Sequence, residues 1–258
     1  MKDSNNFDNA AEYGPQDASC RKSCLKKIPV VLCEPEGAAI LISEGRVPVF
    51  LVRHGQTDWN LVLRLQGREH VELNETGIEQ SKKCAELFSR AKALGLDIEK
   101  VYTSPLMRAR DTADIISNAL GLGTSSVEEA LIERDYGELS GLTLEERKIR
   151  FPKGERQVAN VESVPDAAFR MQKALVTMTQ GAKGDLIAVT HGGVINALFL
   201  KITNGKVGTG KNLSDNCGIS IVAVDKKATV PLAYNLNGEE FLDYVRRLKE
   251  NLSYHDKK

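Results

Sequence analysis

The sequence predicts an α/β fold, a layered sheet in which strands and helices alternate, and three observations support this. Short apolar runs with the length of buried strands end abruptly at polar residues, as at 48–53 and 185–190. Segments with apolar residues at helical spacing separate these runs. Capping patterns and turn residues lie between the two kinds of segment. This alternation is typical of layered α/β proteins.

The expected elements follow one another from about residue 47. Strands are predicted over 48–53, 99–103, 185–190, 218–225 and 230–235. Helices are predicted from Thr76, after Ser104-Pro105, over 143–150, 166–180 and 193–201, and from about 239. Three of the helices have start signals. Thr76 with Glu79 and Thr143 with Glu146 have capping-box spacing, and Ser104 precedes a proline at the first helical position.

Residues 1–46 are interpreted as an N-terminal extension of a catalytic domain over 47–258. Residues 1 to about 27 are polar and unpatterned, which predicts disorder. Ile28–Cys33 and Ala38–Ile42 resemble short strands separated by a turn cluster. These two runs could form a hairpin packed on the main domain or belong to a flexible leader, and the sequence leaves both alternatives open.

Composition excludes several classes of function. Lys and Arg number 35, as do Asp and Glu, so a net charge of zero gives no support for nucleic-acid or membrane-surface binding. No apolar run approaches the roughly 18 residues of a membrane span, and Met1–Ala10 lacks an apolar signal core. The five cysteines are an odd number without metal-type pairing, which favours reduced thiols. We therefore expect a cytoplasmic protein with neither a nucleic-acid nor a membrane partner.

Two histidines follow directly after predicted strands. His54 stands in Arg53-His54-Gly55 and His191 in Thr190-His191-Gly192. Ligands of open α/β sheets bind beyond the carboxyl ends of the strands, so both side chains are expected in one crevice. A guanidinium repels a metal cation but matches the geometry of phosphate. A neutral imidazole among cations can attack phosphorus. The pattern favours an oxyanion site over a metal site.

Two further residues complete the predicted site. Arg108 lies in the first turn of the helix after Ser104-Pro105, where free backbone N–H groups favour an anion. With Arg53 and both histidines it would neutralise a phosphoryl group, the main source of catalysis in phosphoryl transfer. Glu133 is the best candidate proton donor, because it follows an apolar pair and burial would keep it protonated. The alternative for Glu133 is a surface ion pair with Arg134.

These and further segments together resemble the histidine phosphatase superfamily, in its phosphoglycerate-mutase-like branch. The matching segments are Leu51–Asn60, Leu65-Gln66-Gly67, Leu73–Gly77 with Gln80, Thr103–Ala109, Glu133–Gly137 and Val189–Gly193. They cover roughly 47–225 in the family's order, and their combination is highly specific. The resemblance implies a three-layer α/β/α sandwich with a mixed, mostly parallel central sheet and a small helical lid.

The resemblance also implies roles for individual residues. His54 would be the nucleophile that forms a phosphohistidine, and Glu133 the general acid and later the base. Arg53, Arg108 and His191 would grip the phosphoryl oxygens, and Asn60, Gln66, Gly67 and the Gly192 backbone would surround the substrate. Neither a metal nor an organic cofactor is expected. The implied partner is a small phosphate ester, and a homodimer stays open.

The chain departs from the family pattern at three positions. His70 and Glu72 stand where the family commonly has Asp and Pro, and Leu139 replaces a common tryptophan. His70 is interpreted as an exposed residue. Cys84 and Arg90 have the Cys-x5-Arg spacing of cysteine phosphatases, but the segment is helical and lacks glycine, so the match is interpreted as chance.

Three functions are weighed. The first is hydrolysis of a phosphomonoester, and the second is a 2,3-bisphosphoglycerate-dependent phosphoglycerate mutase. Mutases carry a longer insertion between the acid and the second histidine, and a lysine where this chain has Gly141–Leu144, so hydrolysis is favoured. The third is a non-catalytic binding module, which predicts loss of a catalytic residue, and none of the candidates is lost.

Overall fold

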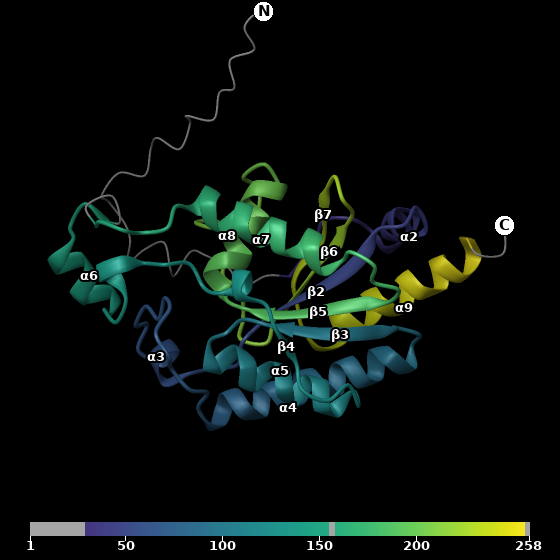
Figure 1. The fold of residues 1–258 in the computed structure, drawn as a ribbon, viewed down its shortest axis with the longest axis horizontal. Coiled ribbons are helices and arrows are strands. Elements are labelled where there is room, and N and C mark those ends of the chain that lie inside the picture. The colour runs from purple at the N-terminus through teal and green to yellow at the C-terminus, as the bar shows by residue number, and fades with distance from the viewer. Residues whose placement is uncertain (1–28, 155–157, 256–258) are drawn as a thin grey trace, which may run out of the picture.

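A computed structural model describes residues 29–154 and 158–255, which surround one seven-stranded sheet (Figure 1). The strand order is β1-β7-β6-β2-β5-β3-β4. The strands are β1 (Val30–Val31), β2 (Val47–Arg53), β3 (Ile98–Thr103), β4 (Ser126–Val127), β5 (Asp185–Thr190), β6 (Ile219–Val224) and β7 (Thr229–Leu236). The predicted strands from residue 47 onward are all confirmed, within about two residues.

The sheet is mixed, as predicted, but it is not mostly parallel. β2, β5, β3 and β4 pair in parallel, whereas β2, β6, β7 and β1 pair antiparallel. The physical reason is the short connection between β6 and β7, which permits only an antiparallel pair, because a parallel connection needs a dozen or more residues. The parallel half carries the carboxyl ends at which the predicted site residues stand.

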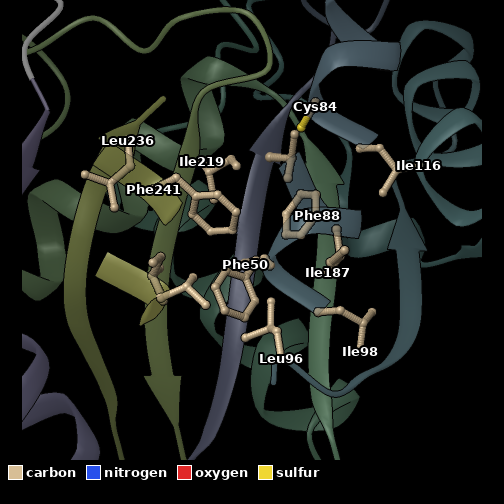
Figure 2. Packing of buried hydrophobic residues seen from close by; sticks show 14 of the residues in the cluster. Phe50, Cys84, Phe88, Leu96, Ile98, Ile116, Ile187, Ile219, Leu236 and Phe241 are labelled. Carbon is tan, nitrogen blue, oxygen red and sulfur yellow. The ribbon is translucent and has the colours of Figure 1, made fainter. Parts of the chain in front are cut away.

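Helices cover both faces of the sheet and make the expected three layers. Phe50 and Val52 of β2 pack with α4 (Glu75–Ala93), α5 (Met107–Ala119) and α9 (Gly238–His255), and Phe50 lies edge-on to Phe88 and Phe241 (Figure 2). Val49 and Leu51 point to α7 (Val164–Met178) and α8 (Gly192–Ile202) on the other face. Because both faces are buried, the central strands are continuously apolar.

The N-terminal segment is the main correction to the predicted elements. Ala38–Ile42, predicted as a strand, belongs to helix α2 (Pro35–Ser43). Pro35 fits the first helical turn, where its missing N–H costs nothing, and the helix packs against α9 with Ala38 and Ala39 fully buried. Val30–Val31 pairs with β7 instead of forming a hairpin. Residues 1–27, predicted to be disordered, lie outside the described residues.

Short elements surround the carboxyl end of the parallel strands. They are α3 (Asp58–Leu61), α6 (Leu144–Arg150) and the 3-10 turns η1 (Glu129–Leu131) and η2 (Gly137–Leu139). α3 and α6 lie beyond one end of the sheet, at the left of Figure 1, where the small lid is expected. Within the described segments, no helix combines the length and the apolar character that a membrane span needs.

The helix starts differ in part from those predicted. The Thr143 capping box of α6 is confirmed. α4 is capped by Asn74, whose Oδ1 accepts from the N–H of Gly77, and not by Thr76. α5 begins only at Met107, and no side chain caps it. Ser104, the predicted cap, uses its hydroxyl for a different contact, described below.

Candidate active site

The two predicted histidines meet at the carboxyl end of the parallel strands. His54 follows β2 and His191 lies between β5 and α8, with their ring centroids 5.2 Å apart. Both side chains are buried. His54 lines a cavity of about 330 Å³ together with Arg53, Arg108 and Glu133, and His191 lies directly beside His54. The fold therefore gathers all five predicted catalytic residues, which come from four separate segments of the chain.

The orientation of His54 leaves one ring nitrogen available. Nδ1 lies 2.7 Å from the carbonyl oxygen of Gly55, which can only accept, so Nδ1 carries the proton. Nε2 is then the lone-pair nitrogen, and it accepts from Nε of Arg108 at 3.3 Å. Burial above all, and then the charges of Arg108 and Arg53, hold the pKa of His54 well below its ordinary value. The imidazole is neutral at physiological pH.

Two buried arginines flank His54. Nη1 and Nη2 of Arg108 donate to the carbonyls of Glu69 and Gly67 at 2.7 and 2.8 Å, which fixes the guanidinium. Burial lowers the pKa of Arg108 to about 10, so the group stays charged at neutral pH. Arg53 donates through Nη1 to the carbonyl of Ser214 at 2.7 Å. Its buried Nε finds no partner among the described residues. Both cations are fixed before a ligand arrives.

Ser104 orients His191, a role that the sequence did not reveal. Its Oγ lies 2.7 Å from Nε2 of His191 and accepts from the N–H of Leu106 at 3.3 Å. The hydroxyl can donate to Nε2 or accept from it, and either hydrogen bond fixes the ring orientation and one tautomer of His191. Nδ1 of His191 is buried and has no partner within the described part of the chain. Burial, with Arg108 second, holds the pKa of His191 well below its usual range.

Glu133 is held at the N-terminus of α8. Its Oε1 accepts from the N–H groups of Val194 and Arg134 at 2.9 and 2.8 Å, and Oε2 accepts from that of Gly193 at 3.0 Å. The alternative prediction, a surface ion pair between Glu133 and Arg134, is wrong. Both residues are buried, and Nε of Arg134 donates to the carbonyl of Glu162. A Cβ at Gly193 would lie 2.6 Å from Oε1, so only glycine permits this approach.

The four predicted substrate-binding residues all line the cavity. They are Asn60, Gln66, Gly67 and Gly192. Asn60 also has a structural part, since its Oδ1 accepts from the N–H of Thr57 in the cap of α3. Gln66 is buried, and its Oε1 finds no partner in the described chain.

Other cavity residues were not found from the sequence. Asn216 donates through Nδ2 to the carbonyl of His54 at 3.0 Å, and Arg64 and Arg147 line the lid side. No local sequence pattern marks these residues, because the loops and helices that carry them come together only in the folded chain. His70 is exposed, as interpreted, and does not line the cavity. Among residues 29–154 and 158–255, no group of three His, Cys, Asp or Glu side chains is placed to hold a metal.

Comparison with known proteins shows the family of this chain. Residues 49–237 match the histidine phosphatase superfamily (branch 1), and the chain belongs to this family. It is accordingly an enzyme of the phosphatase class.

Three relatives show the range of the family. The chain is 37% identical over 158 residues to phosphatase PhoE of Bacillus subtilis. The aligned region covers 61% of this chain and 78% of PhoE. It is 33% identical over 185 residues to a metal-independent phosphoserine phosphatase of Arabidopsis thaliana, and the aligned region covers 67% of this chain and 75% of that protein. It is 31% identical over 205 residues to a 2,3-bisphosphoglycerate-dependent phosphoglycerate mutase of Mesorhizobium japonicum (73% and 92%).

The fold is shared with solved structures. Mycobacterial glucosyl-3-phosphoglycerate phosphatase with VO3 superposes with a TM-score of 0.64 at 23% identity, covering 74% of this chain and all of that one. At this identity the similarity shows the fold alone.

Proposed function

We propose that this protein hydrolyses a small phosphate monoester through a phosphohistidine on His54. The orientation of His54 is the observation that carries the proposal. Its Nδ1 is committed to the Gly55 carbonyl, so the lone pair of Nε2 stands beside Arg108 at the base of the cavity. Burial keeps the ring neutral, which a nucleophile requires.

The reaction has two steps. In the first, Nε2 of His54 forms a bond to phosphorus while the ester P–O bond breaks, and Glu133 donates a proton to the leaving oxygen. In the second, water attacks phosphorus, Glu133 takes the water's proton, and the P–N bond breaks to release phosphate and free His54. Arg53 and Arg108 neutralise the transferring group in both steps, and the neutral His191 is proposed to form a hydrogen bond with it. Asn60, Gln66, Gly67 and Gly192 are proposed to contact the substrate.

A labelling experiment tests the covalent step. Brief exposure to an ester with radioactive phosphorus should give a phosphoenzyme that acid destroys and base preserves, as a phosphohistidine does. His54→Ala should abolish the label, and a divalent-metal chelator should leave turnover unchanged. Label that persists in His54→Ala would refute the nucleophile, and dependence of turnover on a divalent metal would refute the mechanism.

A second candidate is phosphoglycerate mutase, favoured by the similarity to the Mesorhizobium enzyme over 92% of its length. The two functions differ in what accepts the phosphoryl group from His54. Adding 3-phosphoglycerate to the labelled enzyme should release inorganic phosphate if the protein is a phosphatase, and labelled bisphosphoglycerate if it is a mutase. A cytoplasmic location and the absence of nucleic-acid partners stay predictions.

A further inference from the structure

Two buried thiols that the proposed reaction does not use lie behind the site. Cys84 comes from α4, where Figure 2 shows it near Phe88, and Cys217 precedes β6. The two thiols are close enough for each to shift the pKa of the other. Sγ of Cys84 also lies 3.9 Å from the carbonyl oxygen of Cys217, and Oγ of Ser81 lies 3.9 Å from Sγ of Cys217. The two residues are 133 positions apart but form one contact.

The segment that carries Cys217 supports the proposed nucleophile. The N–H of Cys217 donates to the carbonyl of Arg53 at 2.9 Å, and Nδ2 of Asn216 donates to the carbonyl of His54 at 3.0 Å. The carbonyl of Ser214 accepts from Nη1 of Arg53 at 2.7 Å. A displacement of Cys217 would therefore be transmitted directly to Arg53 and His54.

The two thiols differ in reactivity. The neighbouring Cys84 thiol is the main cause that lowers the pKa of Cys217; burial opposes it, and Ser81 and the charge of Arg53 act with it. The neighbouring Cys217 thiol and burial raise the pKa of Cys84. Since the thiolate is the reactive form of cysteine, we expect Cys217 to react with an oxidant before Cys84 does.

We propose that Cys84 and Cys217 form a reversible disulfide with hydrogen peroxide, and that this bond inactivates the neighbouring site. The Cys217 thiolate attacks one peroxide oxygen, the O–O bond breaks, and a sulfenic acid and, after protonation, one water result. The sulfur of Cys84 then attacks the Cys217 sulfur and displaces hydroxide, which leaves as water with the Cys84 proton. The two sulfurs together lose the two electrons that reduce the peroxide.

Inactivation follows from the geometry and depends on the proposed function. A disulfide is about 2.05 Å long, shorter than any non-bonded contact between two sulfurs, so the Cys217 segment and α4 must approach each other. That movement pulls on the carbonyl of Arg53 and, through Asn216, on that of His54. Misplacing reacting groups by about 1 Å costs on the order of 10²-fold in rate, so we expect a loss of that size.

The test uses the full chain with Cys20, Cys24 and Cys33 replaced by serine, which leaves only the proposed pair. After treatment with hydrogen peroxide, mass spectrometry should detect the Cys84 and Cys217 peptides joined, with a loss of two hydrogens, and dithiothreitol should separate them. Hydrolysis of an aryl phosphate should fall on the order of 10²-fold and return with dithiothreitol. The matched control, Cys84→Ala in the same background, should retain basal activity and form no cross-link.

Each part has its own failing result. Absence of the Cys84–Cys217 cross-link in the folded protein would overturn the modification site. A complete cross-link with unchanged turnover would overturn the switch. A reduced enzyme that hydrolyses no phosphate ester would refute the proposed function. The cross-link is detected by mass alone, so its own measurement would still support or overturn the modification site.

Discussion

The two ends of the active-site cavity are built differently. At the sheet end, His54, Arg108 and His191 are almost fully buried, and hydrogen bonds to backbone or to a buried serine hold each of them. At the lid end, α3 and α6 have no fully buried residue. There, Arg64 lies over the Trp59 ring at 5.7 Å and pairs with the half-exposed Glu146 at 3.6 Å.

The difference separates chemistry from selectivity. Charges fixed in a buried site need no reorganisation when the transition state forms, so the sheet end can supply the rate. Exposed ion pairs contribute about 0–1 kcal/mol, so the lid end can change its residues at little cost in stability. We therefore expect loss of an arginine or a histidine at the sheet end to affect every substrate, and substitutions at the lid end to affect only some.

The largest and most selective loss is expected for Glu133→Gln. If Glu133 protonates the leaving oxygen, hydrolysis of a glycerol phosphate should fall by about 10²–10⁴-fold. An aryl phosphate with an acidic phenol leaves without full protonation and should lose much less. Steady-state kinetics on the two esters measure the split. Equal losses for both would mean that Glu133 only orders the α8 N-terminus.

Arg108→Ala should slow both esters alike, by about 10²–10³-fold, because it removes charge at the transferring group itself. Since Arg108 also holds the carbonyls of Gly67 and Glu69, Arg108→Lys serves as the matched variant, and circular dichroism checks the fold of both. A loss confined to the glycerol ester would contradict this role.

Ser104→Ala should cost about fivefold in kcat, since one hydrogen bond is worth about 1 kcal/mol. The more telling readout is the nitrogen NMR spectrum of His191, whose tautomer should no longer be fixed. Ser117→Ala, at a buried serine in the last turn of α5, should change neither. An unaltered His191 spectrum in Ser104→Ala would show that the hydroxyl does not set the tautomer.

The buried histidines should make stability depend on pH. An unfolded chain binds protons at its histidines below about pH 6.5, whereas His54 and His191 have lowered pKa values and stay neutral in the native state. The free energy of unfolding should therefore fall as pH drops below 6.5, by up to about 1.4 kcal/mol per pH unit and histidine. It should level off below the native pKa values.

Urea unfolding between pH 8 and pH 5 measures this slope. His191→Asn should reduce it, and His70→Asn, at an exposed position, should not. The same slope in wild type and His191→Asn would mean that His191 is not buried in its neutral form.

The smallest effect is expected at the lid. Arg147→Ala should leave hydrolysis of a simple aryl phosphate within about twofold, because Arg147 is only half-buried and lies on the lid side of the cavity. For an ester with a second anionic group, such as 3-phosphoglycerate, KM should rise severalfold. Equal changes for both substrates would place Arg147 with the sheet end, and would remove the distinction between the two ends.

Sequence and structure agree best where local patterns suffice. The run 48–53, its Arg53-His54-Gly55 end and the matching end at His191 predicted that both histidines share one edge, because parallel strands carry their carboxyl ends to the same side. Ala38–Ile42 was misjudged, since a short apolar run is equally compatible with a strand and a buried helix. Packing against α9 stabilises the segment as a helix.

By itself, the sequence determined the layered α/β class, the family and the five residues proposed for catalysis, because each stands in a short segment with its own pattern. Only the tertiary structure decided that Ser104 turns from a helix cap to His191, that Asn216 supports His54, and that Cys84 contacts Cys217. The reason is that these partners lie 87, 162 and 133 positions apart, and hydrogen bonds between them exist only after the sheet has assembled.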